Sequence, residues 1–222
     1  MKRIDCIEAV IFDMDGVIYD TEAFYLKHWI QVFNDFGYEM KKDIYVNAMG
    51  RGRKKVKEYF KSIYGENLPI DEMYKVKDKL LFDAIKNKEI PLKKGAIELL
   101  EFLKSKNIKT ALATSAKRER LDIQLEGSPI VKYFNAIVCG DDVVNSKPNP
   151  EIFLKAANLI DSDPVKSIVI EDSEAGIKAA HDGNMIGLHV EDLKEADESI
   201  KENAYMLFKD LIEIKNYLEG VL

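Results

Sequence analysis

Residues 10–22 read VIFDMDGVIYDTE, an apolar run that ends in two aspartates, Asp13 and Asp15, followed by Gly16. A short apolar run bounded by turn residues is typical of a buried strand. Two neighbouring carboxylates are unfavourable there, because desolvation and mutual repulsion both disfavour their charged forms unless a positive charge offsets them. The two aspartates therefore either begin a solvated turn or belong to a site that receives a cation and a ligand.

Further apolar runs alternate with helical patterns along the chain. Strand character is found at 9–12, 110–114, 136–139, 167–170 and 185–190, and amphipathic helical patterns at 96–105, 149–160 and 174–183. Apolar strands that alternate with helices indicate parallel pairing with helices on both faces. We therefore expect an α/β fold with a Rossmann-like parallel sheet.

One segment interrupts this alternation, because from Thr21 to about Glu89 the pattern is helical only. Apolar residues repeat at helical spacing within 24–36, within 53–65 and around 73–85. The pattern predicts a small all-helical domain, residues 21–90, inserted into a catalytic core formed by 1–20 and 91–222. The alternative is that these helices simply pack on the sheet.

The composition excludes several classes of protein. The 222 residues are 46% hydrophobic, which suits one large domain or a core with an insert. The net charge of −6 is opposite to the basic surface expected for nucleic-acid binding. Acids interrupt the apolar N-terminus and no apolar run reaches membrane-spanning length, so we expect a cytoplasmic protein without membrane or nucleic-acid partners. We also expect a monomer. The two cysteines, Cys6 and Cys139, are expected to be buried free thiols.

Polar residues follow four of the predicted strands. They are Asp13, Asp15 and Gly16 after the first, Thr114 and Ser115 after the second, Lys147 in SKPNP after the third, and Glu171, Asp172 and Ser173 after the fourth. The carboxyl ends of parallel strands lie along one edge of the sheet, where ligands bind. Acids, hydroxyls and one lysine are therefore expected to meet at that edge.

These residue types suit phosphoryl transfer. The carboxylate of Asp13 can attack phosphorus, and a second acid two residues on can protonate the leaving oxygen and later deprotonate water. Mg²⁺ prefers hard oxygen ligands, which Asp13 and Asp172 could supply. Thr114 and Ser115 at a helix start and the charge of Lys147 suit phosphate oxygens.

Four motifs carry a resemblance to a known family. DMDGV, ATS, SKPNPEIF and IEDSEAGI match the nucleophile, Thr/Ser, lysine and acidic motifs of the haloacid dehalogenase-like superfamily, in the order in which the family has them. The sequence resembles the branch that holds β-phosphoglucomutase and many small-metabolite phosphatases. The helical insert matches the small cap domain of this branch, so the resemblance covers nearly the whole chain.

The resemblance implies a role for each acid. Asp13 matches the nucleophile and a Mg²⁺ ligand, and Asp15 matches the general acid/base with its backbone carbonyl on the metal. Asp172 matches a metal ligand and Glu171 a companion acid on or near the metal. Glu171 could instead cap the next helix. True dehalogenases lack the counterpart of Asp15, because a halide needs no protonation.

The resemblance also implies phosphate-binding positions at Thr114 and Lys147, with Ser115 beside them. The alternative for the two hydroxyls is ordinary helix capping, and for Lys147 it is a surface lysine.

The predicted cap bears on substrate choice. In GRGRKK, Gly50 and Arg53 fit the ends of a mutase G-x-S-R stretch whose arginine holds a second phosphate, but Gly52 replaces the serine. Tyr25 stands where mutases have a cap histidine, and Ala116 where they have a serine. A solvated helix start is the alternative for the basic run.

Taken together, the motifs predict a Mg²⁺-dependent phosphatase of a small phosphorylated metabolite, a sugar or polyol phosphate, acting through an aspartyl-phosphate. The cap would close over the substrate, with hinges near Asp20–Thr21 and Pro91. A β-phosphoglucomutase-type phosphotransferase is the alternative, and a non-catalytic binding protein with this fold is a further one.

Overall fold

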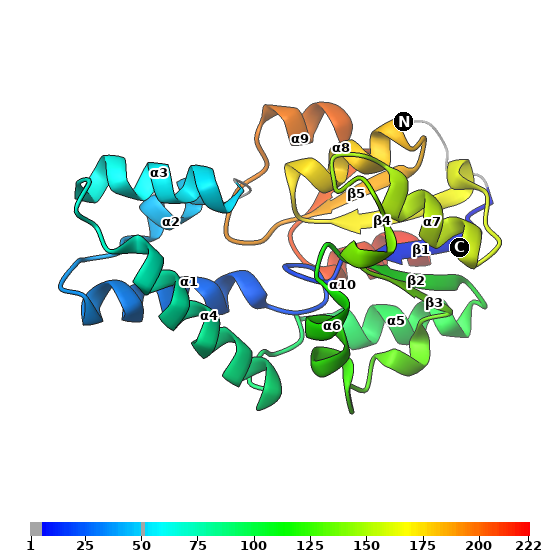
Figure 1. The fold of residues 1–222 in the computed structure, drawn as a ribbon. Coiled ribbons are helices and arrows are strands. Elements are labelled where there is room, and N and C mark those ends of the chain that lie inside the picture. Colours follow the sequence, from blue (N-terminus) through cyan, green and yellow to red (C-terminus); the bar gives the residue numbers. More distant parts are fainter. Residues whose placement is uncertain (1–5, 50–51) are drawn as a thin grey trace. The chain divides into compact units, whose positions relative to one another are not determined.

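The structure, a computed structural model, describes residues 6–49 and 52–222 and divides into two compact units (Figure 1). One unit consists of the chain up to Asp20 together with Pro91–Leu222, and the other of Thr21–Ile90. The backbone N–H of Asp20 donates to the carbonyl of Pro91 at 2.9 Å, and Tyr19 pairs with Leu92 in an antiparallel bridge. The two points where the chain leaves and re-enters the first unit are therefore hydrogen-bonded to each other.

A parallel sheet forms the centre of the first unit. Within the described residues it has six strands in the order β3-β2-β1-β4-β5-β6. The strands are β1 (Ala9–Phe12), β2 (Lys109–Ala113), β3 (Ala136–Val138), β4 (Ser167–Glu171), β5 (Ile186–Val190) and β6 (Met206–Phe208). The strand β1 lies between β2 and β4, so the residues that follow it emerge at the middle of the sheet edge. The predicted α/β fold class is confirmed.

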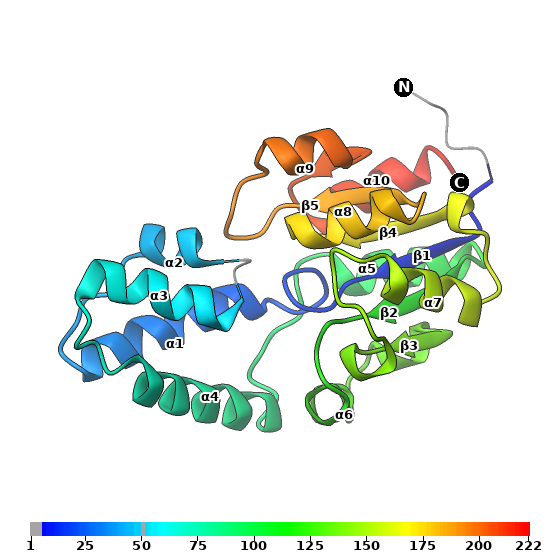
Figure 2. The same cartoon turned by 45° about the horizontal axis from the view of Figure 1, so that its top comes forward.

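Helices cover both faces of this sheet (Figures 1 and 2). The helices of this unit are α5 (Ala96–Ser105), α6 (Arg118–Leu125), α7 (Glu151–Leu159), α8 (Glu174–Asp182), α9 (Glu198–Asn203) and α10 (Leu211–Glu219). On one face, Ala9 and Ile11 of β1 join a buried cluster with Phe153 of α7 and Ala179 of α8. On the other face α5 packs against α10. The central strands β1 and β4 are buried along their whole length, which explains their apolar sequences, whereas the edge strands β3 and β6 are only partly buried.

The second unit is built from four helices within the described residues, and it has an aromatic core of its own. The helices are α1 (Thr21–Asp35), α2 (Lys42–Ala48), α3 (Arg53–Tyr64) and α4 (Ile70–Lys86). The buried ring of Trp29 meets Phe33, Phe60 and Tyr74 edge-on, with centroids 5.7, 5.6 and 4.9 Å away. Edge-to-face pairs of this kind stabilise a core beyond the area that they bury.

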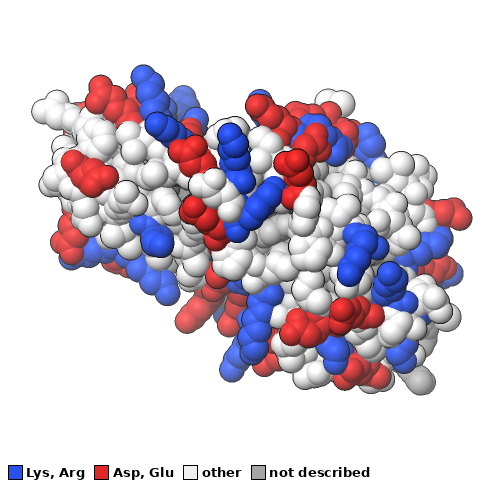
Figure 3. Space-filling view, turned by 90° about the horizontal axis from the view of Figure 1, so that it is seen from below, with Lys and Arg blue, Asp and Glu red and all other residues white. Residues whose placement is uncertain are grey.

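The structure also shows features that the sequence pattern did not predict. The short elements α2, α6, α9, β6 and α10 are additional. Cys139 is buried as expected, but the expectation for Cys6 is wrong, because Cys6 is exposed before the start of β1. Basic and acidic side chains are both spread over the visible face of each unit (Figure 3). None of the helices in the described ranges is long and apolar enough to span a bilayer.

Candidate active site

Adjacent strands bring Asp13 and Glu171 together. Phe12, the last residue of β1, is in register with Ile170 of β4. The backbone N–H of Asp13 continues this pairing by donating to the carbonyl of Ile170 at 3.0 Å. Asp13 therefore leaves the sheet directly beside Glu171, the last residue of β4.

Lys147 lies between these two acids. Its Nζ is 2.5 Å from Oδ1 of Asp13 and 2.6 Å from Oε1 of Glu171, and it lies 3.5 Å from the carbonyl of Ala113 at the end of β2. The side chains of Asp13, Lys147 and Glu171 are 10, 7 and 2% exposed. Lys147 is therefore not the ordinary surface lysine of the alternative interpretation.

The charges in this cluster do not balance, since two buried carboxylates share one ammonium group. Burial raises the pKa of Asp13 and Lys147 opposes this, but the carboxylates of Glu171 and Asp15 add to the effect of burial, so that the pKa lies at about 7. For Lys147, burial lowers the pKa, but Asp13 and Glu171 outweigh it and hold the pKa above the ordinary value of lysine. An additional cation would favour the charged form of Asp13.

The loop after β1 brings Asp172 against its backbone. Gly16 has φ +79°, a left-handed conformation that favours glycine, and a β-carbon there would lie 2.5 Å from Oδ2 of Asp172. The carboxylate of Asp172 therefore occupies space that any side chain at position 16 would need.

The donor chemistry of this region fits a hard divalent cation. Carboxylate and carbonyl oxygens are the preferred ligands of Mg²⁺. Among the described residues no three His, Cys, Asp or Glu side chains form a metal-binding cluster. The carboxylate of Asp15 pairs with Arg120 and that of Glu171 with Lys147. The predicted ligands are only two carboxylates, Asp13 and Asp172, and one backbone carbonyl, so they do not need a cluster of three side chains. The assignment of these ligands stays a prediction.

Glu171 does not cap the following helix. That role belongs to Ser173, whose Oγ accepts from the backbone N–H of Gly176 at 3.0 Å. Oε2 of Glu171 accepts from the N–H and the hydroxyl of Ser173, while Oε1 faces Lys147. Glu171 thus links the lysine to the start of α8.

The two predicted phosphate-binding hydroxyls differ in environment. Thr114 is buried, and its Oγ1 accepts from the backbone N–H of Ala116 at 3.0 Å, which braces the turn after β2. Ser115 is exposed and lines, together with Ser146 and Lys147, a pocket of about 160 Å³. Neither hydroxyl caps α6, which begins after Lys117.

Two residues of this region were not predicted. Arg120 of α6 forms an ion pair with Asp15. His189 of β5 is buried, and its Nε2 lies 3.0 Å from the backbone carbonyl of Asp172. A carbonyl only accepts, so Nε2 carries the proton, and burial lowers the pKa of the imidazole. Neither residue falls in a motif, so the sequence offered no signal for either contact.

In the helical unit, Arg53 is held by neighbours of its own unit. Its guanidinium pairs with Asp78 and lies 4.3 Å from the centre of the Tyr74 ring. Gly50, the other end of the predicted recognition stretch, lies outside the described residues. The role of Arg53 in substrate choice stays a prediction.

Comparison with known proteins identifies relatives over nearly the whole chain. The family model described as haloacid dehalogenase-like hydrolase matches residues 10–190. A phosphorylated carbohydrates phosphatase of Thermotoga maritima is 36% identical over 97% of this chain and 100% of its own. The β-phosphoglucomutase of Bacillus subtilis is 31% identical over 83% of each chain. A crystal structure from Thermotoga maritima, 32% identical, covers 97% of this chain and 100% of that chain with a TM-score of 0.80.

Proposed function

Because the chain belongs to the haloacid dehalogenase-like hydrolase family, we propose that it is a Mg²⁺-dependent phosphatase of a small phosphorylated metabolite, such as a sugar or polyol phosphate. The observation that carries the proposal is the buried contact of Asp13 with Lys147 at the end of β1. It presents one carboxylate to a phosphate ester beside a fixed positive charge. The Thermotoga maritima phosphatase supports the substrate class.

The proposed reaction has two displacements at phosphorus. In the first, an oxygen of Asp13 forms a bond to phosphorus, the ester P–O bond breaks, and Asp15 gives a proton to the departing alcohol oxygen. In the second, a water oxygen attacks phosphorus while Asp15 takes a proton from that water. The bond to Asp13 then breaks and inorganic phosphate leaves, so the enzyme is restored with no net change.

The surrounding residues would support these steps electrostatically. Lys147 contacts the carboxylate of Asp13, where it would orient that nucleophile and neutralise part of the charge on the phosphoryl oxygens. Glu171 holds the other side of Lys147, which fixes the position of the ammonium group. Mg²⁺, held by Asp13, Asp172 and the carbonyl of Asp15, would neutralise the crowded negative charge when bound.

We assign substrate choice to the helical unit, Thr21–Ile90, as the inserted cap domain. The buried aromatic core around Trp29 makes it a unit that holds its own shape. Arg53 stands at the first position of α3 with a half-exposed guanidinium, where it can meet an anionic substrate. We also propose that the chain acts as a monomer, which sedimentation velocity would check.

A mutase is the second candidate, supported by the relationship to the Bacillus subtilis enzyme. A mutase must keep water away from its aspartyl-phosphate, whereas a phosphatase admits it. Gly52, Tyr25 and Ala116 stand where the resemblance leads us to expect serine, histidine and serine in a mutase. These three departures favour the phosphatase.

Phosphate release from a panel of sugar and polyol phosphates with Mg²⁺ tests the proposal. We expect turnover by the unaltered protein and none above background by Asp13→Asn, with both proteins giving the same circular dichroism spectrum. Robust activity of Asp13→Asn would overturn the mechanism. Conversion of β-glucose 1-phosphate into the 6-phosphate, primed by the bisphosphate, would favour the mutase. Absence of turnover with every phosphoester would favour a binding protein.

A further inference from the structure

Arg120 contacts the candidate acid/base directly, although 105 positions separate it from Asp15 in the chain. Its Nη2 donates to Oδ1 of Asp15, and both side chains are about three-quarters buried. We propose that Arg120 is a positioning residue that holds the Asp15 carboxylate in the orientation needed to give a proton to the departing alcohol oxygen and later to take one from water. The inference rests on the proposed phosphatase function.

Charge distribution is the first argument. Asp15 follows the buried Asp13 by two positions, and their carboxylates repel each other. Lys147 is engaged by Asp13 and Glu171, so it is not the cation that contacts Asp15. The guanidinium of Arg120 supplies a separate counter-charge, which offsets the tendency of Asp15 to rotate away from its neighbour.

The position of Arg120 is itself fixed, which is the second argument. Arg120 lies in the first turn of α6, and Oε1 of Gln124, one turn further on, accepts from the same Nη2 at 3.4 Å. Gln124 is buried, so this contact limits the freedom of a long side chain. A planar guanidinium between two acceptors loses less freedom on binding than an ammonium group would.

A second contact ties the same loop to the same segment. The hydroxyl of Tyr19 lies 2.7 Å from Oγ of Ser128, shortly after the end of α6. Within the loop, the N–H of Gly16 donates to the carbonyl of Tyr19 at 2.9 Å. The loop that carries Asp15 is therefore held to α6 and its following turn at two places, and Arg120 provides the contact at the acid/base itself.

This role predicts a dependence on the leaving group. Departure of an alcohol from an alkyl phosphate needs a proton from Asp15, whereas p-nitrophenolate leaves p-nitrophenyl phosphate as a stable anion. The parameter kcat/KM reports the steps from substrate binding up to the first irreversible one, so it includes leaving-group departure and excludes the later hydrolysis of the aspartyl-phosphate. A misplaced Asp15 should therefore lower kcat/KM for the alkyl phosphate and spare the aryl phosphate.

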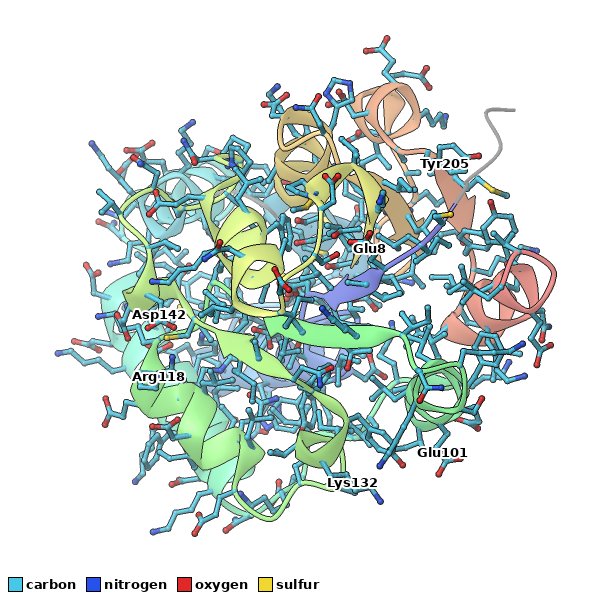
Figure 4. All side chains as sticks on the ribbon, turned by 90° about the vertical axis from the view of Figure 1, so that its right-hand side faces the viewer. Glu8, Glu101, Arg118, Lys132, Asp142 and Tyr205 are labelled. Atoms are coloured by element: carbon cyan, nitrogen blue, oxygen red, sulfur yellow. The ribbon has the colours of Figure 1, made fainter. Side chains whose placement is uncertain are left out.

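The test compares Arg120→Met, Arg120→Lys and Arg118→Met. Arg118 is a matched control, because it lies on the same helix but pairs with Asp142, 2.5 Å away (Figure 4). For Arg120→Met we expect kcat/KM to fall about 100-fold with a sugar phosphate and by less than about 5-fold with p-nitrophenyl phosphate. Arg120→Lys should recover part of the loss, and Arg118→Met should match the unaltered enzyme on both substrates.

A double variant completes the test. If Arg120 acts through Asp15, adding Arg120→Met to Asp15→Asn should lower kcat/KM no further than Asp15→Asn alone. Equal losses on both substrates, or additive losses in the double variant, would overturn the positioning role while leaving the phosphatase intact. An unaltered protein that releases phosphate from neither substrate would overturn the proposed function, and this inference with it.

Discussion

The carboxylate of Asp172 lies against the backbone of Gly16, at a place that a β-carbon on Gly16 would approach to 2.5 Å. The two residues come from different strand ends, the loop after β1 and the turn after β4. The absence of a side chain at position 16 therefore allows the second predicted metal ligand to approach the loop that carries Asp13 and Asp15.

Gly16→Ala should impair both stability and activity. The left-handed backbone costs alanine about 1 kcal/mol, and the overlap with Asp172 adds to it. The matched control is Gly127→Ala, because Gly127 also has positive φ but nothing lies within 4 Å of its β-carbon position. We expect Gly127→Ala to lower the free energy of unfolding by about 1 kcal/mol with kcat retained. Gly16→Ala should lower it more and reduce kcat at least about 10-fold. Urea unfolding measures the stability of the two variants, and phosphate release measures their kcat. Identical effects of Gly16→Ala and Gly127→Ala would contradict the role of the contact with Asp172.

Gly176→Ala should disturb the contact between Glu171 and Lys147. A β-carbon on Gly176 would overlap the carboxylate of Glu171, which must then move away from Lys147. We expect a loss of about 1–3 kcal/mol in the free energy of unfolding, together with reduced kcat. In Gly187→Ala the new atom makes an ordinary 3.5 Å contact with Ala180, so this variant should stay within about 1 kcal/mol of the unaltered protein. An active and fully stable Gly176→Ala would show that Glu171 does not need its present position.

Removal of divalent cations should abolish turnover. We expect phosphate release to cease in excess EDTA and to return with Mg²⁺, because the buried charge near Asp13 then lacks its counter-ion. Asp172→Asn should raise the Mg²⁺ concentration needed for half-maximal activity. Asp182→Asn, which alters an acid at the exposed end of α8, is the control and should not change it. Activity that survives exhaustive chelation would exclude the proposed cation requirement.

Arg53→Ala should raise KM for anionic substrates and change kcat little, because the substitution removes a guanidinium that does not belong to the phosphoryl-transfer machinery. Lys55→Ala removes an exposed charge from the same helix and serves as the control. Initial-rate kinetics on the best substrate of the panel distinguish the two. An unchanged KM and substrate profile in Arg53→Ala would assign Arg53 to its contacts with Tyr74 and Asp78 alone.

The sequence predicted the elements whose burial leaves a periodic pattern. The strand β1 and the helix α5 have the bounds expected from apolar runs and helical spacing, since both are covered by other elements. The edge strand β6 has three residues, all apolar, and a run of that length is too short to be distinguished from a loop. For the eight-residue helix α6, rich in charged residues, a start was expected at Thr114 and Ser115, but no apolar periodicity marked its extent, and it begins only after Lys117.

In the candidate site, the residues that lie in motifs were predicted, and the others were not. Asp13, Lys147 and Glu171 were expected at one sheet edge, and the structure brings them into contact. Their proximity follows from the rule that parallel strands end together. The contacts of Arg120 with Asp15 and of His189 with Asp172 depend on how α6 and β5 pack against the loops. Such pairings join distant positions and leave no local signal in a single sequence.

The hydrogen bond between Asp20 and Pro91 gives the helical segment the character of an exchangeable cassette. The chain leaves the sheet unit and returns to it at two neighbouring positions. Helices of another length or sequence could therefore replace this segment without altering the path of any strand. Related hydrolases could thus acquire new substrate preferences by replacing this segment, while the catalytic residues at the sheet edge stay the same.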